Sequence, residues 1–403
     1  MNTIFETITS GTITSPQGFL AGAVSSGIKT QKGLDLAILY SEQSCVAAGV
    51  FTTNAIKASP IIFAQKNLEN NRAQMFVVNS GCANACTGES GYDDTKKMAN
   101  LAAAKMGISS NDVLIASTGV IGIRLPMTKI EHGISQITIS KQGGKEFAKA
   151  IMTTDTGTKE IALSLESDIG KFIIGGVAKG SGMIHPNMAT MLCFITTDAN
   201  VDVDFLQIAL QKAVDQSFNM ITVDGDTSPS DMAVVLANRL AGNELINKKN
   251  GNDFQRALND VCLFLAKCII RDGEGSTKLI EVVVKGAYNH MDARLASRTV
   301  AGSSLFKAAI NGNDPNWGRI VAALGRSGAR VNGEKLDLSI NNICVMNHGN
   351  PVTFNAKNLS HTLADKNNDV EVMIQLNMGK GEATAWGCDL SREYVTINSA
   401  YTT

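Results

Sequence analysis

The sequence predicts an α/β protein of the α+β type, in which helices lie outside mixed β-sheets. At 403 residues, the chain is about two to three times as long as a typical domain. Apolar residues make up 44% and charged residues 18%, which is typical of a globular chain with a large buried core. The strand-like runs outnumber those of a single doubly wound sheet, and many follow one another with no helix between them. Mixed sheets are therefore favoured over a purely parallel design.

Short apolar runs bounded by turn residues predict the strands. These runs are residues 34–40, 75–78, 113–116, 172–177, 192–195, 279–284, 370–376 and 383–386. Helical spacing of apolar residues predicts a helix over 92–106, which Gly107 ends. Ser59 is predicted to cap another helix, with Pro60 at its first position. Further helices are predicted over residues 205–218, 254–270, 301–310 and 317–324.

Composition excludes several classes of function. Lys and Arg number 36 against 37 Asp and Glu, so there is no basic surplus for nucleic acid, and aromatics are only 5%. The N-terminus has no secretory pattern, and the longest apolar run, 261–270, carries Lys267 and predicts a buried helix rather than a membrane span. The eight cysteines form no CxxC pair and are expected to be reduced. We expect a cytoplasmic protein without nucleic-acid or membrane partners.

The most informative segment is Ala178-Lys-Gly-Ser-Gly-Met-Ile-His-Pro-Asn-Met-Ala-Thr190. A strand enters it and another leaves it, and its glycines and proline permit unusual backbone angles. A strained turn would let the Thr190 hydroxyl attack the carbonyl of Ala189 and cut the chain there. Thr190 would then be an N-terminal nucleophile, with its own α-amino group (pKa near ~8) as the base. The alternative is that Thr190 is only a β-branched strand residue facing a loop.

Three polar clusters follow apolar elements. Thr118 and Gly119 end a strand, where a hydroxyl and a backbone N–H can face one oxyanion, as acyl transfer requires. Thr153-Thr-Asp-Thr156 and Asp272-Gly-Glu-Gly-Ser276 each follow a helix. By themselves, all three clusters are also explained as ordinary caps or turns.

Other motifs fail. The glycines after residue 174 lack P-loop order, no GxSxG elbow occurs, and no His or Cys cluster has metal-ligand spacing. His185 is interpreted as a loop histidine that braces the turn, because an N-terminal threonine needs no separate base. No metal and no cofactor are expected.

Taken together, the motifs resemble the ornithine acetyltransferases (glutamate N-acetyltransferases) of arginine biosynthesis. The segment from Lys179 to Thr190 is very similar to the cleavage motif of that family. The other similar segments, in chain order, are Val78-Asn-Ser-Gly-Cys-Ala-Asn-Ala85, Ala116-Ser-Thr-Gly-Val-Ile-Gly122, Met152-Thr-Thr-Asp-Thr156, Thr222-Val-Asp-Gly-Asp-Thr-Ser228, Gly312-Asn-Asp-Pro-Asn-Trp-Gly-Arg319 and Asn398-Ser-Ala-Tyr-Thr-Thr403.

The resemblance implies stacked mixed sheets with helices outside, as in self-processing aminopeptidases. It implies cleavage between Ala189 and Thr190 into an α-chain (1–189) and a β-chain (190–403), which together form one active site. Thr190 would be the nucleophile, and Thr118 and Gly119 the oxyanion hole. The substrate-binding positions implied are Thr153, Lys179, Thr190, Glu274, Asn398 and Thr403.

The activity implied is acetyl transfer from N2-acetyl-L-ornithine to L-glutamate through an acetyl-threonine, with no cofactor. Acetyl-CoA remains open as a second donor, and two α- and two β-chains are expected to associate. One alternative is a self-processing aminopeptidase or amidohydrolase of the same fold. Another is a non-catalytic protein that binds small ligands and never cleaves itself.

Overall fold

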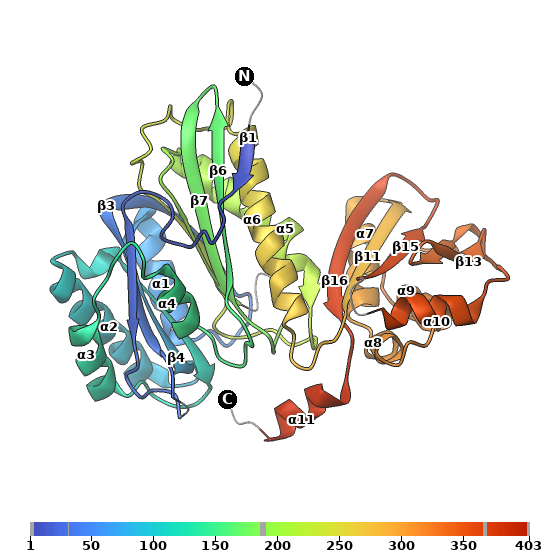
Figure 1. Ribbon diagram of the computed structural model, residues 1–403, viewed down its shortest axis with the longest axis horizontal. Coiled ribbons are helices and arrows are strands. Elements are labelled where there is room, and N and C mark those ends of the chain that lie inside the picture. The colour runs from blue at the N-terminus through green and yellow to red at the C-terminus, as the bar shows by residue number, and fades with distance from the viewer. Residues whose placement is uncertain (1–3, 31, 186–190, 366–368, 401–403) are drawn as a thin grey trace.

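The fold is built around two mixed β-sheets, which lie in two parts of the molecule (Figure 1). The computed structural model describes residues 4–30, 32–185, 191–365 and 369–400. The nine-stranded sheet has the order β1-β6-β7-β8-β10-β3-β4-β5, with β2 also paired to β3. Its strands are β1 (Ile4–Thr7), β2 (Phe19–Val24), β3 (Leu36–Phe51), β4 (Arg72–Cys82), β5 (Val113–Val120), β6 (Lys159–Ser167), β7 (Gly170–Lys179), β8 (Leu192–Thr197) and β10 (Met232–Ala237).

The seven-stranded sheet comes mainly from the last third of the chain and has the order β14-β13-β12-β15-β11-β16-β9. Its strands are β9 (Ile221–Thr222), β11 (Leu279–Ala287), β12 (Asp337–Ile340), β13 (Ile343–Asn347), β14 (Asn350–Pro351), β15 (Val370–Gln375) and β16 (Gly381–Cys388). Parallel and antiparallel pairs occur in both sheets, which confirms the predicted fold class.

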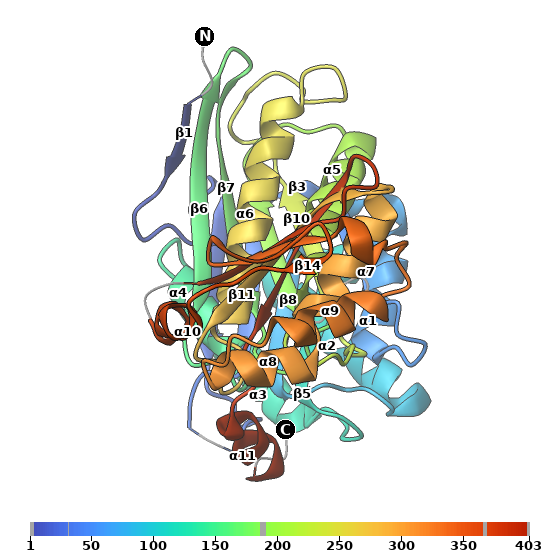
Figure 2. The same ribbon diagram turned by 90° about the vertical axis from the view of Figure 1, so that its right-hand side faces the viewer.

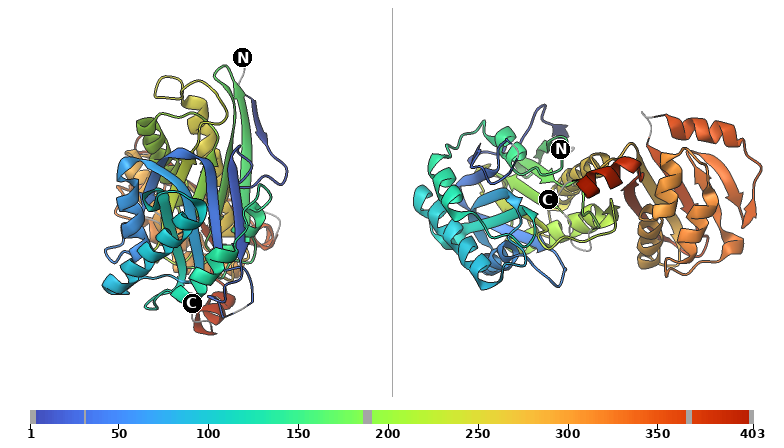
Figure 3. Two further views of the ribbon diagram at one scale, coloured as in Figure 1. Left: turned by 90° about the vertical axis from the view of Figure 1, so that its left-hand side faces the viewer. Right: turned by 90° about the horizontal axis from the view of Figure 1, so that it is seen from below.

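Helices flank both sheets. The larger sheet carries α1 (Ser59–Asn67), α2 (Gly88–Met106), α3 (Met127–Gln136) and α4 (Gly144–Ala150), together with α5 (Val203–Gln216) and α6 (Asn252–Arg271). The smaller sheet carries α7 (His290–Ala301), α8 (Ser304–Asn311), α9 (Trp317–Gly325) and α10 (Ala356–Ala364) (Figure 2). The last helix, α11 (Arg392–Ala400), lies between the two parts when the molecule is viewed from below (Figure 3, right).

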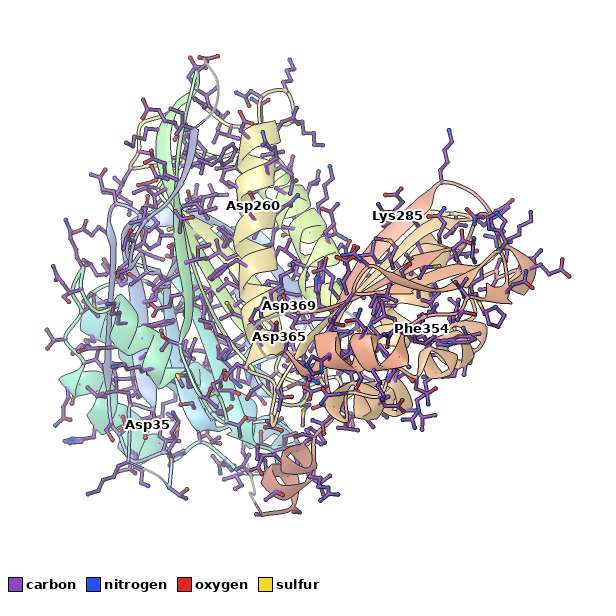
Figure 4. All side chains as sticks on the ribbon, turned by 45° about the vertical axis from the view of Figure 1, so that its right-hand side comes forward. Asp35, Asp260, Lys285, Phe354, Asp365 and Asp369 are labelled. Carbon is purple, nitrogen blue, oxygen red and sulfur yellow. The ribbon has the colours of Figure 1, made fainter. Side chains whose placement is uncertain are left out.

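One hydrophobic core joins the two sheets through α5 and α6. Leu206 and Leu265 of these helices belong to the same buried cluster as Val282 and Phe306 of the smaller part. At the end of α6, Arg271 makes two hydrogen bonds of 2.7 and 2.6 Å to Asp369, just before β15 (Figure 4). The two sheets are therefore held in one arrangement, which fixes the elements that meet between them.

All eight predicted strands are present. The alternation in β4 shows why its apolar run is a strand: Phe76 and Val78 enter one core cluster, and Met75 and Val77 enter another. Burial on both faces produces a continuous apolar run instead of an alternating one.

The predicted helices are also present, with two local differences. The helix predicted over 301–310 is broken, because α7 ends at Ala301 and the Ser303 hydroxyl caps α8 by accepting the N–H of Phe306. The N-cap of α1 is Ala58, so Ser59 is the first helical residue. All eight cysteines are free, as expected. Within the described residues, none of the helices combines the length and the apolar character needed to cross a bilayer.

Candidate active site

The predicted site residues converge on one pocket. A cavity of about 120 Å³ is lined by Thr118, Gly119, Thr153, Lys179, Glu274 and Asn398, among other residues. They come from five separate segments of the chain, since Thr118 and Gly119 are neighbours on β5, so the fold brings six sequence-predicted positions together. Met191 and Leu192 also line the pocket. Ala189, Thr190 and Thr403 lie outside the described residues, but Thr190 is covalently bonded to Met191.

Thr118 and Gly119 stand near the end of β5, beside Ser80 and Gly81 of the parallel strand β4. Gly119 has a φ of +125°, which L-residues with a side chain rarely adopt. A Cβ on Gly119 would lie 2.4 Å from the carbonyl carbon of Gly81. Only glycine fits there, so the backbone of this turn is held against β4 and faces the pocket.

Lys179, the last residue of β7, connects Thr118 and Thr153 within the pocket. It is buried, and its Nζ donates to Thr153 Oγ1 at 2.8 Å and to Thr118 Oγ1 at 3.3 Å. Burial lowers the pKa of Lys179, and the nearby Asp155 carboxylate opposes this effect. A bound anion would favour the charged form further. Because Thr118 accepts from Lys179, its own hydroxyl proton is left to donate into the pocket.

A buried ion-pair network supports Lys179 from behind. Lys159 Nζ lies 2.7 Å from Asp155 Oδ1 and 2.5 Å from Asp272 Oδ2. Asp155 also accepts the N–H groups of Thr153 and Gly180. Burial alone would raise the pKa of Asp155, but Lys179 and Lys159 outweigh it and hold that pKa well below its usual range. The polar clusters around Asp155 and Asp272, which looked like separate turns in the sequence, therefore form one charged scaffold. Lys159, which sequence reasoning missed, joins them.

Glu274 and Asn398 form the opposite side of the pocket. Asn398 Nδ2 donates to Glu274 Oε2 at 2.7 Å, and the Glu274 N–H donates to the Ser181 carbonyl at 2.9 Å. A Cβ on Gly182 would lie 2.4 Å from the Glu274 carboxylate, so any larger residue there would require the Glu274 side chain to move. This side presents both carboxylate acceptors and amide donors.

The motif around Thr222 braces the segment that leads to the predicted cleavage site. Asp224 accepts the N–H groups of Met183 and Ile184 at 2.6 and 2.8 Å. His185 Nδ1 lies 2.9 Å from Thr222 Oγ1, and the Arg298 guanidinium donates to His185 Nε2 at 3.2 Å. Burial and then Arg298 lower the pKa of His185 to about 4, so the ring is neutral and acts as a brace.

Asp231 lines the same pocket and was not singled out from the sequence. It is 3% exposed, and its Oδ2 has no hydrogen-bond partner among the residues that the structure describes. Burial raises the pKa of Asp231 well above its usual range, although Ser228, Lys179 and Met191 oppose this. Its position just before β10, beside Met191, places this carboxyl group at the start of β8. The only signal in the sequence is an acidic residue directly before a fully apolar strand.

Known proteins resemble the chain over its whole length. The sequence profile of the ArgJ family matches residues 20–403. An "Arginine biosynthesis bifunctional protein ArgJ" from Dehalococcoides mccartyi (strain CBDB1) is 51% identical over 407 residues, covering 100% of both chains.

Two solved structures also match. The arginine biosynthesis bifunctional protein from Bacillus halodurans is 45% identical, covering 51% of this chain and 97% of its own, with a TM-score of 0.50. An ornithine acetyltransferase complexed with ornithine, from Mycobacterium tuberculosis, is 39% identical. The match covers 46% of this chain and 100% of the M. tuberculosis chain, with a TM-score of 0.43. The chain therefore belongs to the ArgJ family and is an acyltransferase of arginine biosynthesis.

Proposed function

We propose that Thr190, freed by scission before it, carries an acetyl group from N2-acetyl-L-ornithine to L-glutamate. The observation that carries this proposal is the pocket itself. An oxyanion turn, a lysine and an acidic side chain line one cavity together with Met191, to which Thr190 is bonded. The donor substrate carries a carbonyl, a carboxylate and an ammonium group, and each has a counterpart in this set.

Recognition follows from charge. Lys179 and Thr153 provide donors for the α-carboxylate that both substrates share, and charge-assisted hydrogen bonds of this kind contribute roughly 1.5–3 kcal/mol each. At the distal end, Glu274 supplies acceptors for the ammonium of ornithine. Asn398 Nδ2 donates to Glu274 Oε2 and to the Tyr394 carbonyl, and when glutamate binds it would turn one N–H from Glu274 to the side-chain carboxylate of glutamate. One pocket can then serve two amino acids whose far ends differ in charge.

The reaction proceeds in two halves. The α-amino group of Thr190 takes the hydroxyl proton, and the hydroxyl oxygen attacks the acetyl carbonyl. The Thr118 hydroxyl and the Gly119 N–H stabilise the oxyanion, the C–N bond breaks, and ornithine leaves with the proton. The amine of glutamate then attacks the threonine ester and releases N-acetylglutamate. This is ping-pong exchange through one covalent intermediate.

Chain scission has independent support. The B. halodurans chain is matched over 97% of its length but accounts for only 51% of this chain, so it is about half as long. A β-chain starting at Thr190 would have a similar length. The same proposal includes a cytoplasmic location. It also includes an assembly of two α- and two β-chains, and the mass of the purified complex in solution would test that assembly.

The experiment compares wild type with Thr190→Ala and Thr190→Ser. Wild type and Thr190→Ser should run as two bands on a denaturing gel, because both keep a hydroxyl nucleophile. Thr190→Ala should stay whole and inactive. With acetyl-ornithine, wild type should form N-acetylglutamate only when glutamate is added. Release of free acetate regardless of glutamate would instead identify a hydrolase, and full activity of an intact chain would refute the mechanism.

A further inference from the structure

The chain that leads into the predicted scission site is bound by a segment from beyond that site. Asp224 accepts the N–H groups of Met183 and Ile184 at 2.6 and 2.8 Å. The Val223 N–H donates to the Ile184 carbonyl at 2.7 Å. Asp224 and the backbone next to it therefore bind three polar groups of two consecutive residues, which leaves this stretch little freedom to move.

His185, the last described residue before the scission site, is bound from the same segment. Its carbonyl accepts the Thr227 hydroxyl at 2.9 Å, and its Nδ1 lies 2.9 Å from Thr222 Oγ1. We define the clamp as Thr222, Val223, Asp224 and Thr227. After scission, the clamp would belong to the β-chain, and the residues that it binds would belong to the α-chain. The clamp therefore joins the two chains close to the cut.

Elements outside the clamp fix it in place. The Lys307 side chain of α8 is 3% exposed, and its Nζ donates to the Val223 carbonyl. From α11, the Tyr394 hydroxyl donates to the Asp224 carboxylate, and burial and then this negative charge raise the pKa of Tyr394. Burial also raises the pKa of Asp224, and the N–H groups that it accepts oppose the rise. A carboxylate held in this way keeps its acceptor atoms at fixed positions.

The chain is also fixed directly after the scission site. The Met191 carbonyl accepts an N–H from the start of β10 at 3.0 Å, and Leu192 pairs with Lys179 of β7. Scission requires the Thr190 hydroxyl to meet the carbonyl carbon of Ala189. An intramolecular attack is fast when the reacting groups are held close to their productive geometry, so fixed chain on both sides of the bond favours it.

We propose that Asp224 is a positioning residue for chain scission, which acts by holding the residues ahead of Ala189 through the clamp. It sets the rate at which the chain cuts itself, and it does not set the rate of acetyl exchange. Asp224 is not among the described residues that line the active-site pocket, so it does not share the substrate contacts assigned above. The inference rests on the proposed function, because it requires scission before Thr190.

The chemistry of scission is an acyl shift followed by hydrolysis. The Thr190 hydroxyl oxygen attacks the Ala189 carbonyl carbon, the C–N bond breaks, and the hydroxyl proton ends on the freed α-amino group. Water then opens the ester, which leaves a carboxylate on Ala189 and restores the hydroxyl of Thr190. Asp224 accepts backbone N–H groups throughout and exchanges no proton in either step, so its effect is confined to position.

The test follows the intact chain and its two products on a denaturing gel after a pulse of cell-free synthesis. Asp224→Asn replaces one carboxylate oxygen with an NH₂ group that cannot accept, so scission should be at least about tenfold slower. Thr227→Val removes the hydroxyl and keeps the size, and it should slow scission about threefold. Asp226→Asn is the matched control. It removes the same charge from an exposed residue two positions further on and should cut at the wild-type rate.

The cleaved fraction separates positioning from a general loss of structure. Once cut, Asp224→Asn should have the wild-type kcat and the wild-type KM for acetyl-ornithine, because the pocket residues are unchanged. Scission at the wild-type rate would overturn the proposal, as would slow scission together with an equal loss of kcat in the cleaved fraction. If Asp224→Asn does not fold, Thr227→Val decides, because wild-type scission by that variant would overturn the proposal as well.

Failure of the proposed function gives a different result. The wild-type chain would then stay intact on the gel, whereas failure of the role of Asp224 leaves wild-type scission unaffected. The first outcome is read from wild type alone, and the second from the comparison of wild type with the variants.

Discussion

The two sides of the pocket differ in how firmly they are built. Thr118, Gly119 and Lys179 stand at the ends of strands in the nine-stranded sheet, and buried ion pairs support Lys179. Glu274 lies in the loop after α6, and Asn398 lies on α11, a helix with no buried residue among those described. The side to which we assign the carbonyl and the α-carboxylate is therefore rigid. The side to which we assign the variable end of the substrate is held by few contacts.

This difference matches what the exchange reaction requires. Stabilising an oxyanion needs donors fixed in advance, because reorganisation during the reaction would cost rate. The distal end must accept first an ammonium and then a carboxylate, and a lightly anchored helix can adjust to each. Variants on the rigid side should reduce turnover for both substrates, whereas variants on the α11 side should change the preference between them.

Gly119→Ala should have the largest effect. The substitution places a Cβ 2.4 Å from the Gly81 backbone at a φ of +125°, so the turn must move and the oxyanion donors move with it. Loss of one such donor costs roughly 100- to 1,000-fold in kcat, which steady-state assays of folded, cleaved protein would measure. Gly122→Ala is the control, because Gly122 also has positive φ but has open space around its Cβ position. Comparable losses from both variants would mean that backbone strain, not oxyanion geometry, is responsible.

Lys179→Met should have the second largest effect, a rise of about 10- to 100-fold in the KM for acetyl-ornithine. Lys171→Met, an exposed position on the same strand, is the control. The wild-type pH profile should agree. Because burial lowers the pKa of Lys179, its charge is present below that lowered pKa and is lost as pH rises through it. KM should therefore rise at a lower alkaline pH than an exposed lysine would give, and a flat profile up to pH 10 would contradict the role of Lys179 as the anion-binding cation.

Asn398→Asp tests the adjustable side. The new carboxylate would lie beside Glu274 and repel the distal carboxylate of glutamate, so the KM for glutamate should rise about tenfold. The KM for acetyl-ornithine, whose distal group is an ammonium, should stay the same or fall. Ser399→Asp adds the same charge one residue further along α11 and should leave both values unchanged. Equal increases for both substrates would contradict the assignment of Asn398 to the distal end.

The sequence predicted the site through motif order, and it missed what only packing creates. Thr118, Glu274 and Asn398 are far apart in the chain, yet their resemblance to family motifs was enough to place them in one site. Lys159 and Asp231 carry no such pattern. Their importance comes from burial next to charges that other segments contribute, which local sequence does not encode.

The fold class was predicted correctly, but several strands were missed. Apolar runs in β4 and β8 were recognised because both faces of those strands are buried. Strand β6 is 9 residues long but was missed, because its apolar stretch is short and is interrupted by Ser164. Strand β10 was also missed, although all six of its residues are apolar and buried, so burial on both faces does not by itself make a run recognisable. Tertiary pairing completes both strands, β6 with β1 and β7, and β10 with β3 and β8.

Asp231→Asn should have the smallest effect of these variants. It changes the free energy of unfolding rather than the kinetics, at a residue beside the start of β8 in the nine-stranded sheet. Burial raises the pKa of Asp231, so the folded protein holds this proton while the unfolded chain releases it near the ordinary aspartate value. The contribution of Asp231 to stability is therefore present below that ordinary value and is lost as pH rises through the folded-state pKa. Asparagine keeps the shape without the titration. The free energy of unfolding of the variant should equal or exceed that of wild type at neutral pH, and the difference should shrink towards pH 4. A variant clearly less stable than wild type at pH 8 would mean that Asp231 is charged in the fold and paired with Lys179, which would make it part of the anion-binding machinery.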